Sequence, residues 1–280
     1  MKDESVLSNP IANCADESSG TGQEFSTEQT TSSFILQPSS FQQPSSFRIL
    51  LWDIDGTLIR STQKDSYKTY FVPMLDRVFA TSGCLSEMQV SGMTDLQIVV
   101  EALRYEDFSR EQVFARIDQL RECYMDEMKK VASNGNHFFE VLPGVPELLK
   151  TLAAEPRYHS ALLTGNIEPA AHFKMELVGL SQYFDLPGAF GDESHNRRDL
   201  PALAADRIRK HLQVDLAAEQ FVVIGDTPND IDCAKHFGAK ALAVGTGRMF
   251  SRDEVLACNP DAFVPDFSDT DLVMKTLARL

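Results

Sequence analysis

Two aspartates separated by one residue follow the first strongly apolar run of the chain. Asp53 and Asp55 stand directly after residues 47–52, which have the composition of a buried strand. Side chains at positions i and i+2 of a strand share a face, so both carboxylates can address one small target. Two anions this close repel each other unless a cation, a shared proton or phosphate chemistry offsets their charge. The structural alternative is that Asp55-Gly56 forms a turn that Asp53 caps.

A polar tripeptide follows a second apolar run. Residues 159–163 lead into Thr164-Gly165-Asn166, and Pro169 then suits the first turn of a helix. Thr164 and the amides after it would lie between a strand end and a helix N-terminus, where free N–H groups favour an anion. The alternative is an ordinary helix start with Thr or Asn as its cap.

A second pair of aspartates follows a later apolar run, residues 220–224. Asp226 stands at the strand end, and Asp230 would fall in the first turn of a helix capped by Thr227. An acid at the position of Asp230 also satisfies cap amides and the helix dipole, whereas Asp226 has no comparable structural explanation. If this strand lies beside the first, the carboxylates form an oxygen-rich pocket suited to Mg²⁺.

The apolar runs alternate with helical patterns from Phe47 onward. Runs that are apolar on both faces predict an α/β fold: a parallel, Rossmann-like sheet flanked by helices on both faces. Ligands bind at the carboxyl edge of such a sheet, where the polar groups described above all fall. The main runs are 48–53, 159–163, 220–224 and 240–244, with a weaker one at 186–190 and a short one at 262–264.

About a hundred residues between the first two strands read almost wholly as helix, far more than an ordinary crossover contains. A stripe of apolar residues from Val113 to Val131 predicts one long amphipathic helix, Thr94-Asp95 starts another through Leu103, and 64–81 is a third. We expect an all-helical cap that acts as a lid over the site. The predicted parts are a tail (1–46), a catalytic core (47–63 and 141–280) and the helical cap (64–140).

Composition narrows the class of protein. The 280 residues are 43% hydrophobic, which suffices for a core, and the net charge of −15 argues against nucleic-acid or anionic-membrane partners. The five cysteines are scattered without a C-x-x-C pair, so reduced thiols are expected. The chain has neither a bilayer-length apolar run nor a secretory signal pattern, which predicts a cytoplasmic location. The first 46 residues have too few apolar side chains to offset ordering entropy and are predicted to be disordered.

The motifs also occur in a familiar order. The run D-x-D-G-T-L at Asp53, the threonine after the second strand, and G-D-x-x-x-D from Gly225 to Asp230 together resemble the haloacid dehalogenase-like hydrolase superfamily. The resemblance covers roughly residues 48–280. Residues 142–149 are similar to the return into the core of members whose helical cap lies between the first two motifs, the phosphoglycolate phosphatase-like branch.

This resemblance implies a mechanism and a set of roles. Asp53 would be the nucleophile that forms an aspartyl-phosphate, and Asp55 would be the acid and base that serves the leaving group and the water. The substrate would be a small phosphorylated metabolite, and a monomer or homodimer is expected. Mg²⁺ would be held by Asp53, the carbonyl of Asp55 and Asp226, and Asp230 would complete the metal site by ordering a ligand or bound water. Phosphate would be held by Thr164, Gly165, Asn166 and a cation.

The cation departs from the family pattern. Members usually carry a lysine before the fourth strand, often followed by proline, whereas this chain has two arginines, Arg197 and Arg198. Alignment on Pro201 places Arg198 at the lysine position, with Arg197 as the alternative. A third reading is that either arginine is only a solvated charge at a helix start. Arginine keeps the charge and offers two donors to a phosphate.

Several functions other than phosphate-ester hydrolysis are compatible with this resemblance. Carbon–halogen hydrolysis needs no acid for the leaving halide, so the presence of Asp55 favours phosphate chemistry. A sugar phosphomutase would keep the same core residues and is the alternative function. A non-catalytic phosphate-binding protein is less favoured, because the two leading aspartates and Asp226 are all retained.

Overall fold

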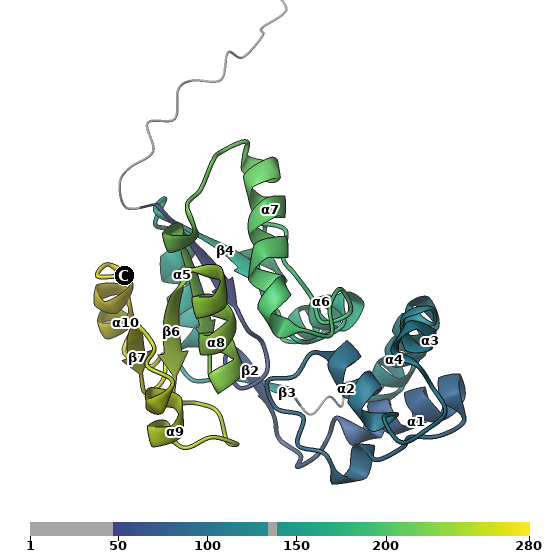
Figure 1. Ribbon diagram of the computed structural model, residues 1–280. Helices are drawn as coiled ribbons and strands as arrows, with labels where there is room; N and C mark the ends of the chain where they lie inside the picture. Colours follow the sequence, from purple (N-terminus) through teal and green to yellow (C-terminus); the bar gives the residue numbers. More distant parts are fainter. Residues whose placement is uncertain (1–46, 134–138) are drawn as a thin grey trace, which may run out of the picture. The chain divides into compact units, whose positions relative to one another are not determined.

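The computed structural model describes residues 47–133 and 139–280, which form an α/β fold around a parallel sheet (Figure 1). Five strands run in the order β4-β1-β5-β6-β7. The predicted fold class is confirmed, whereas the predicted tail lies outside the described residues. The strands are β1 (Arg48–Trp52), β4 (Tyr158–Leu162), β5 (Phe221–Gly225), β6 (Lys240–Val244) and β7 (Ala262–Val264).

The central strand β1 shows why the sheet is covered on both faces. Leu50 and Trp52 enter one hydrophobic cluster, whereas Ile49 and Leu51 enter another. All four side chains are fully buried. This alternation follows from the two-residue period of a strand, and it requires an apolar layer on each side of the sheet.

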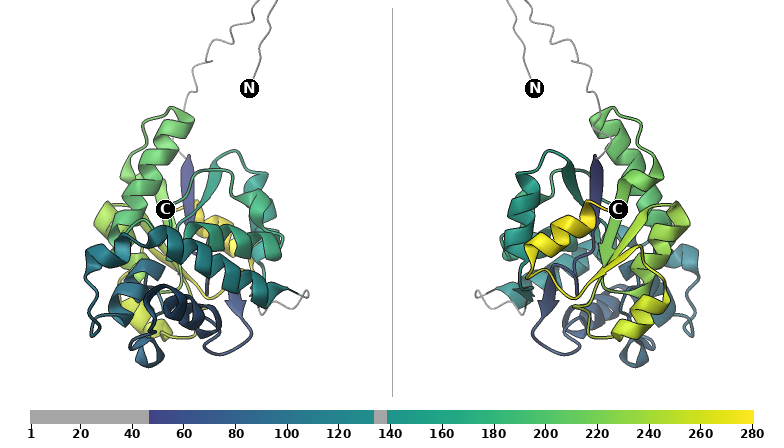
Figure 2. Two further views of the ribbon diagram at one scale, coloured as in Figure 1. Left: turned by 90° about the vertical axis from the view of Figure 1, so that its right-hand side faces the viewer. Right: turned by 90° about the vertical axis from the view of Figure 1, so that its left-hand side faces the viewer.

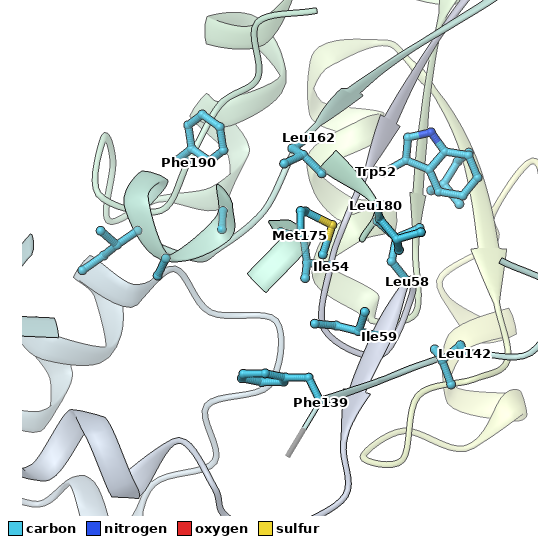
Figure 3. Packing of buried hydrophobic residues seen from close by; sticks show 14 of the residues in the cluster. Trp52, Ile54, Leu58, Ile59, Phe139, Leu142, Leu162, Met175, Leu180 and Phe190 are labelled. Atoms are coloured by element: carbon cyan, nitrogen blue, oxygen red, sulfur yellow. The ribbon is translucent and has the colours of Figure 1, made fainter. Parts of the chain in front are cut away.

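Two groups of helices supply these layers, as Figures 1 and 2 show. Figure 3 shows the cluster around Trp52, where Leu162 of β4, Met175 and Leu180 lie among the labelled side chains. Helices α5 (Val145–Ala153), α6 (Glu168–Leu177) and α10 (Thr270–Leu277) contribute to that cluster, and α7 (Leu200–Leu212), α8 (Pro228–Phe237) and α9 (Arg252–Ala257) contribute to the opposite one.

A helical segment separates the first two strands of the sheet. It leaves and re-enters the core through a two-stranded antiparallel sheet, β2 (Ile59–Ser61) with β3 (Phe139–Val141). We call residues 64–133 the helical insertion. Its largest contact is between α1 and α4, where the rings of Tyr70 and Phe71 lie 5.1 and 5.3 Å from that of Tyr124. Its helices are α1 (Lys68–Phe79), α2 (Asp95–Ala102), α3 (Arg110–Phe114) and α4 (Ile117–Ala132).

The single long helix predicted for the insertion is in fact two helices. Ser109 and Gln112 form a capping box that starts α3, and the chain breaks before α4. At the break, Arg116 donates to the carbonyl of Val78 at the end of α1, 3.0 Å away. Its guanidinium also lies over the ring of Phe79, 5.0 Å from the ring centre. The apolar stripe continues through the break, which is why the spacing alone predicted one helix.

The weak apolar run at 186–190 does not form a strand. It makes one isolated bridge, between Ala189 and Leu163. Pro187 has no N–H group to donate to a strand ladder. Gly188 lies so close to β4 that an added Cβ would be 2.4 Å from the carbonyl oxygen of Leu162.

The remaining regular elements are short. None of the described helices is both long and apolar enough to cross a bilayer. Four 3-10 turns complete the description: η1 (Leu85–Glu87), η2 (Ser181–Tyr183), η3 (Arg197–Asp199) and η4 (Ala218–Gln220).

The substitution Leu51→Ala tests how much the central strand contributes to the free energy of unfolding. Truncation in Leu51→Ala leaves a cavity between β1 and the α7–α8 layer, and we expect the free energy of unfolding to fall by about 2–5 kcal/mol. Urea denaturation measures the loss. The control Leu272→Ala, at a side chain that is 42% exposed, should change it by less than about 0.5 kcal/mol. Equal losses would contradict the assignment of the core.

Candidate active site

The carboxyl ends of β1 and β5 bring three aspartates together. Trp52 lies opposite Ile224 in the parallel register, and the N–H of Asp53 donates to the carbonyl of Ile224 at 3.0 Å. Asp53 and Asp226 therefore leave neighbouring strands at the same level. One carboxylate oxygen from each of Asp53, Asp226 and Asp230 lies within 4.8 Å of the others, and all three residues are buried.

Short backbone segments enclose the Asp226 carboxylate. Thr57 donates its hydroxyl to Oδ1 of Asp226 at 3.2 Å. Gly56 has a φ of +90°, and an added Cβ would lie 2.4 Å from Oδ2 of Asp226. A Cβ on Gly247 would approach the same oxygen to 2.2 Å. Glycine is needed at both positions because the backbone approaches the carboxylate too closely for a side chain. Sequence reasoning did not identify Thr57 or Gly247.

Arg197 is the buried cation of the site. Its Nη2 donates to Oδ1 of Asp53 at 3.0 Å and also to Oδ1 of Asp230. Only 7% of its side chain is exposed. Its Nη1 donates to the carbonyl of Gly92 in the helical insertion at 3.4 Å. One guanidinium therefore joins the first strand, the start of α8 and the insertion.

The predicted placement of Arg198 in this site is wrong, and the alternative residue, Arg197, occupies the position. Arg198 is 51% exposed and forms a bidentate pair with Asp232, at 2.6 and 2.9 Å. Neighbouring residues of the 3-10 turn η3 point in different directions, and the side chain of Asn196 accepts the N–H of Arg198. Alignment on Pro201 was therefore displaced by one residue.

Asp230 has the capping role that the sequence offered as its structural explanation, and it also binds the buried cation. Its Oδ2 accepts the N–H of Thr227 at 3.0 Å and the hydroxyl of Thr227 at 2.7 Å, which completes the capping box of α8. Its Oδ1 accepts from Arg197. The carboxylate thus caps the helix and also holds the buried guanidinium. Gly225 makes room for it, because a Cβ there would lie 2.4 Å from Oδ2 of Asp230.

Three buried carboxylates around one guanidinium leave an excess of negative charge. Burial raises the pKa of Asp53 to about 7, Arg197 opposes the rise, and the charges of Asp230 and Asp55 add to it. Burial and the charges of Asp230 and Asp53 also hold the pKa of Asp226 well above its usual range. Carboxylate oxygens are the donors that Mg²⁺ prefers, so the donor set and its charge fit a hard divalent cation.

Asp55 is more exposed than Asp53 and contacts a different cation. Its side chain is 44% exposed, and its Oδ2 accepts from Lys174 at 2.7 Å and from Asn166 at 2.8 Å. Lys174 lies on α6 and is only 2% exposed. Sequence reasoning missed this lysine. The available signal was its position on the apolar side of the helix, beside Ala170, Ala171 and Met175.

The loop of residues 164–166 contacts Asp55 and closely approaches Arg197. The hydroxyl oxygen of Thr164 accepts from the N–H and the side-chain amide of Asn166, at 3.3 and 2.8 Å. A Cβ on Gly165 would lie 2.2 Å from the carbonyl of Met93 and 3.1 Å from Nη1 of Arg197. The structure therefore places Thr164, Gly165 and Asn166 together at the predicted strand end, between Arg197 and Asp55.

The first amides of α6 are not available to an external anion. The N–H of Ile167 donates to Oδ2 of Asp95 at 2.8 Å, and that of Glu168 donates to Oδ1 of Asp192 at 3.1 Å. The prediction of free amides after Thr164 is wrong for these two groups. Two carboxylates of the protein satisfy them instead, and Asp95 belongs to the insertion, so this helix start is also a docking point for α2.

A cleft of about 310 Å³ opens beside the buried guanidinium. Gln97 of the insertion and Asn229 of α8 both line it, and Asn229 also donates to the carbonyl of Gly92 at 2.7 Å. Arg197 itself is among the lining residues. Its lining residues are Gln97, His195, Asn196, Arg197, Arg198, Asn229 and Asp232.

Comparison with family models decides the family. Residues 47–238 match the model described as haloacid dehalogenase-like hydrolase. The chain belongs to this family. The match includes every candidate site residue, from Asp53 to Asp230. Comparison with curated proteins found no match.

Solved structures share the fold of this hydrolase. A predicted phosphoglycolate phosphatase from Haemophilus somnus 129PT is 18% identical with a TM-score of 0.57, over 82% of this chain and 99% of its own. A predicted phosphatase from Clostridium acetobutylicum is 20% identical with a TM-score of 0.56, over 84% and 100%. A β-phosphoglucomutase from Clostridium difficile is 16% identical with a TM-score of 0.58, over 83% and 98%.

Arg197 is predicted to hold the site together in the metal-free protein. Arg197→Met leaves buried carboxylates without their cation, so we expect the free energy of unfolding to fall by about 3–5 kcal/mol. The matched control Arg198→Met breaks an exposed ion pair and should cost less than about 1 kcal/mol. Urea denaturation in the presence of a chelator compares the two. Similar losses in both variants would contradict the distinction between them.

Asp95 is predicted to make stability depend on pH. Burial raises its pKa to about 7, against the effects of the Ile167 N–H and Lys174, while Asp55 and Asp192 add to the rise. Between pH 4 and 7 the folded protein therefore binds a proton that the unfolded chain lacks, and stability falls as pH rises through this window.

Asp95→Asn removes this contribution. The free energy of unfolding of the variant, minus that of the unchanged protein, should be larger at pH 8 than at pH 5 by at least about 1 kcal/mol. This size follows because each pKa unit corresponds to about 1.4 kcal/mol. Urea denaturation at both values measures the gain, with the exposed Asp76→Asn as the control for loss of one charge. A difference that is the same at both pH values would contradict the prediction.

Proposed function

We propose that this protein is a Mg²⁺-dependent phosphatase that hydrolyses a small phosphomonoester through an aspartyl-phosphate on Asp53. The observation that carries the proposal is the environment of Asp53. The buried carboxylate accepts from a guanidinium, 3.0 Å away, and belongs to one acidic group with Asp226 and Asp230. A nucleophile that attacks an anionic phosphate needs cations beside it, and this arrangement supplies one and fits a second.

The first half of the reaction makes the phosphoenzyme. A carboxylate oxygen of Asp53 attacks phosphorus, the bond from phosphorus to the ester oxygen breaks, and Asp55 donates a proton to that oxygen. Arg197 binds the transferring phosphoryl group beside the nucleophile, and Thr164 and the Gly165 amide lie on the neighbouring strand end. The products are the alcohol and the aspartyl-phosphate.

The second half restores the enzyme. Asp55 takes a proton from a water molecule, whose oxygen attacks phosphorus and breaks the bond to Asp53. Inorganic phosphate leaves, and both carboxylates return to their starting states. One residue thus serves as acid and then as base, which suits a carboxylate that is partly exposed to solvent.

Mg²⁺ would be held by Asp53, the backbone carbonyl of Asp55, and Asp226. When bound, it would reduce the repulsion between carboxylate and phosphate and stabilise charge on the phosphoryl oxygens. Asp230 would act indirectly, because both of its oxygens already accept hydrogen bonds, from Thr227 and from Arg197. Asp230 would thus keep the role expected from the sequence, which is to order a ligand or bound water.

The helical insertion would act as the cap that selects the alcohol half of the substrate. Gly92 and Asp95 bind groups of the site directly, so closure of the insertion and assembly of the site are linked. The acidic chain favours a soluble phosphorylated metabolite over nucleic acid or a membrane as the substrate. We also propose a cytoplasmic location and a monomeric or homodimeric state. A sugar phosphomutase is the alternative, and the likeness in fold to a β-phosphoglucomutase keeps it in the test.

A phosphate-release screen tests the proposal. We expect Mg²⁺-dependent release from a panel of sugar phosphates, phosphoglycolate, nucleoside monophosphates and an aryl phosphate, with at least a 10³-fold loss in Asp53→Asn (about 4 kcal/mol in the barrier). Chelator should abolish release. Arg197→Met should lose at least about 10²-fold, and the exposed Arg198→Met less than about 3-fold.

Two results would count against the phosphatase. Isomerisation of a sugar phosphate faster than its hydrolysis would favour the phosphomutase. Phosphate binding without turnover on any ester of the panel would favour a non-catalytic protein. Product analysis by ³¹P NMR separates both results from hydrolysis.

A further inference from the structure

A buried lysine holds the second aspartate of the D-x-D pair. Lys174 donates to Oδ2 of Asp55 at 2.7 Å and to Oδ1 of Asn166 at 2.6 Å. Asn166 in turn donates to the same Oδ2 of Asp55 at 2.8 Å and to the hydroxyl oxygen of Thr164. The three side chains form a closed triangle, in which each member contacts the other two.

Helix packing alone does not explain this lysine. Lys174 lies on the side of α6 that buries Ala170, Ala171 and Met175, where an apolar residue of similar length would pack without cost. Burial of an ammonium group is costly unless it is paired and hydrogen-bonded. Among the described residues, Asp55 is the one carboxylate in salt-bridge contact with it. The pairing with Asp55 therefore offsets the cost of burying Lys174.

The surroundings keep the ammonium in place. The ring of Phe139, the first residue of β3, lies 5.3 Å from Nζ of Lys174. An aromatic face attracts a cation, and it also excludes water from this side of the contact. Burial lowers the pKa of Lys174, but the charge of Asp55 and its hydrogen bond outweigh this effect, and the net shift is upward.

The triangle distinguishes the two oxygens of Asp55. The hydrogen bonds that described side chains make to this carboxylate all reach Oδ2, which accepts from two N–H donors. A proton on Asp55 must then reside on Oδ1, because Oδ2 already faces two hydrogens. Proton transfer requires that the acid lies within hydrogen-bond reach of the leaving-group oxygen, so a rotated carboxyl loses much of its effect.

We propose that Lys174 is a positioning residue for proton transfer: with Asn166 it fixes Oδ2 of Asp55, so that Oδ1 donates the proton to the leaving oxygen and later accepts one from water. The inference rests on the proposed phosphatase function and adds a residue to it. No bond to Lys174 forms or breaks, and its ammonium keeps its protons throughout.

The dependence on the leaving group tests this role. Lys174→Met keeps the length of the side chain and removes the donor. An alkyl phosphate needs a proton on its leaving oxygen, whereas 4-nitrophenyl phosphate releases a stable anion. We expect kcat/KM for the alkyl ester to fall at least about 10²-fold and that for the aryl ester less than about 5-fold, since general acid catalysis contributes about 10²–10⁴. The exposed Lys150→Met is the matched control and should change neither value.

A double-mutant cycle with Asp55→Asn tests whether the lysine acts through the aspartate. If it does, Asp55→Asn/Lys174→Met should lose no more than about 3-fold beyond Asp55→Asn alone on the alkyl ester. Equal losses on both esters, or losses that multiply in the cycle, would overturn the proposal. The second outcome would instead assign Lys174 to direct binding of the substrate.

A crystal structure of Lys174→Met provides a test that is independent of turnover. We expect the Asp55 side chain to leave the orientation in which Oδ2 accepts from Asn166, and an unchanged orientation would overturn the proposal. If Lys174→Met does not fold, Lys174→Gln serves instead, with the same expectation for Asp55. Absence of hydrolysis by the unchanged enzyme would contradict the phosphatase function, while the crystal structure would still decide the positioning role.

Discussion

The buried contact of Arg197 with Asp53 and Asp230 is the interaction on which the rest of the site depends. The parallel register of β1 and β5 forces Asp53 and Asp226 to the same level, and the capping box of α8 brings Asp230 beside them. Such a concentration of charge is unfavourable away from water unless a cation shares the space. The guanidinium reaches two of the three carboxylates from a short turn before α7, and it also contacts the insertion.

Close backbone approach is the second constraint, and it explains the glycines of the site. The loops carrying Gly56 and Gly247 lie against Asp226, and Gly225 lies against Asp230. A side chain at any of these positions would collide with a carboxylate, because its Cβ would lie within 3.0 Å of that group. Since proton and phosphoryl transfer both tolerate little misplacement, the glycines act on the reaction through the positions of the acids. Gly165 has the same relation to Arg197 and to the insertion.

The sequence predicted the strands and the acids well, for a physical reason. A strand buried on both faces is continuously apolar, so its end is visible, and a carboxylate at that end has few structural explanations. This reasoning located Asp53, Asp55, Asp226 and Asp230. It failed where the role of a residue depends on the direction in which its side chain points. Arg197 and Arg198 are adjacent in sequence, and only the geometry of the 3-10 turn decides which one is buried.

Long-range contacts were the other gap. Lys174 is 119 residues from Asp55, and its position on the apolar side of α6 indicates burial without indicating its partner. Asp95 is 72 residues from Ile167, whose N–H group it accepts. The sequence therefore predicted a free amide at the start of α6, although this amide is hydrogen-bonded. Neither pairing has a periodic or local signal. The first depends on where α6 lies beside the end of β1, and the second on how α2 of the insertion meets the start of α6.

Each aspartate of the D-x-D pair contacts a different buried cation. Arg197 binds Asp53, on the side of the other acids, and Lys174 binds Asp55, on the side of α6 and the insertion. With all four acids ionised, the two cations leave the group two charges short of neutrality, which is the charge of one Mg²⁺. The raised pKa of Asp53 follows from its burial and from this excess of negative charge. Under the proposed function, a bound cation beside Arg197 would reverse the local charge, and an acidic chain would then attract an anionic substrate.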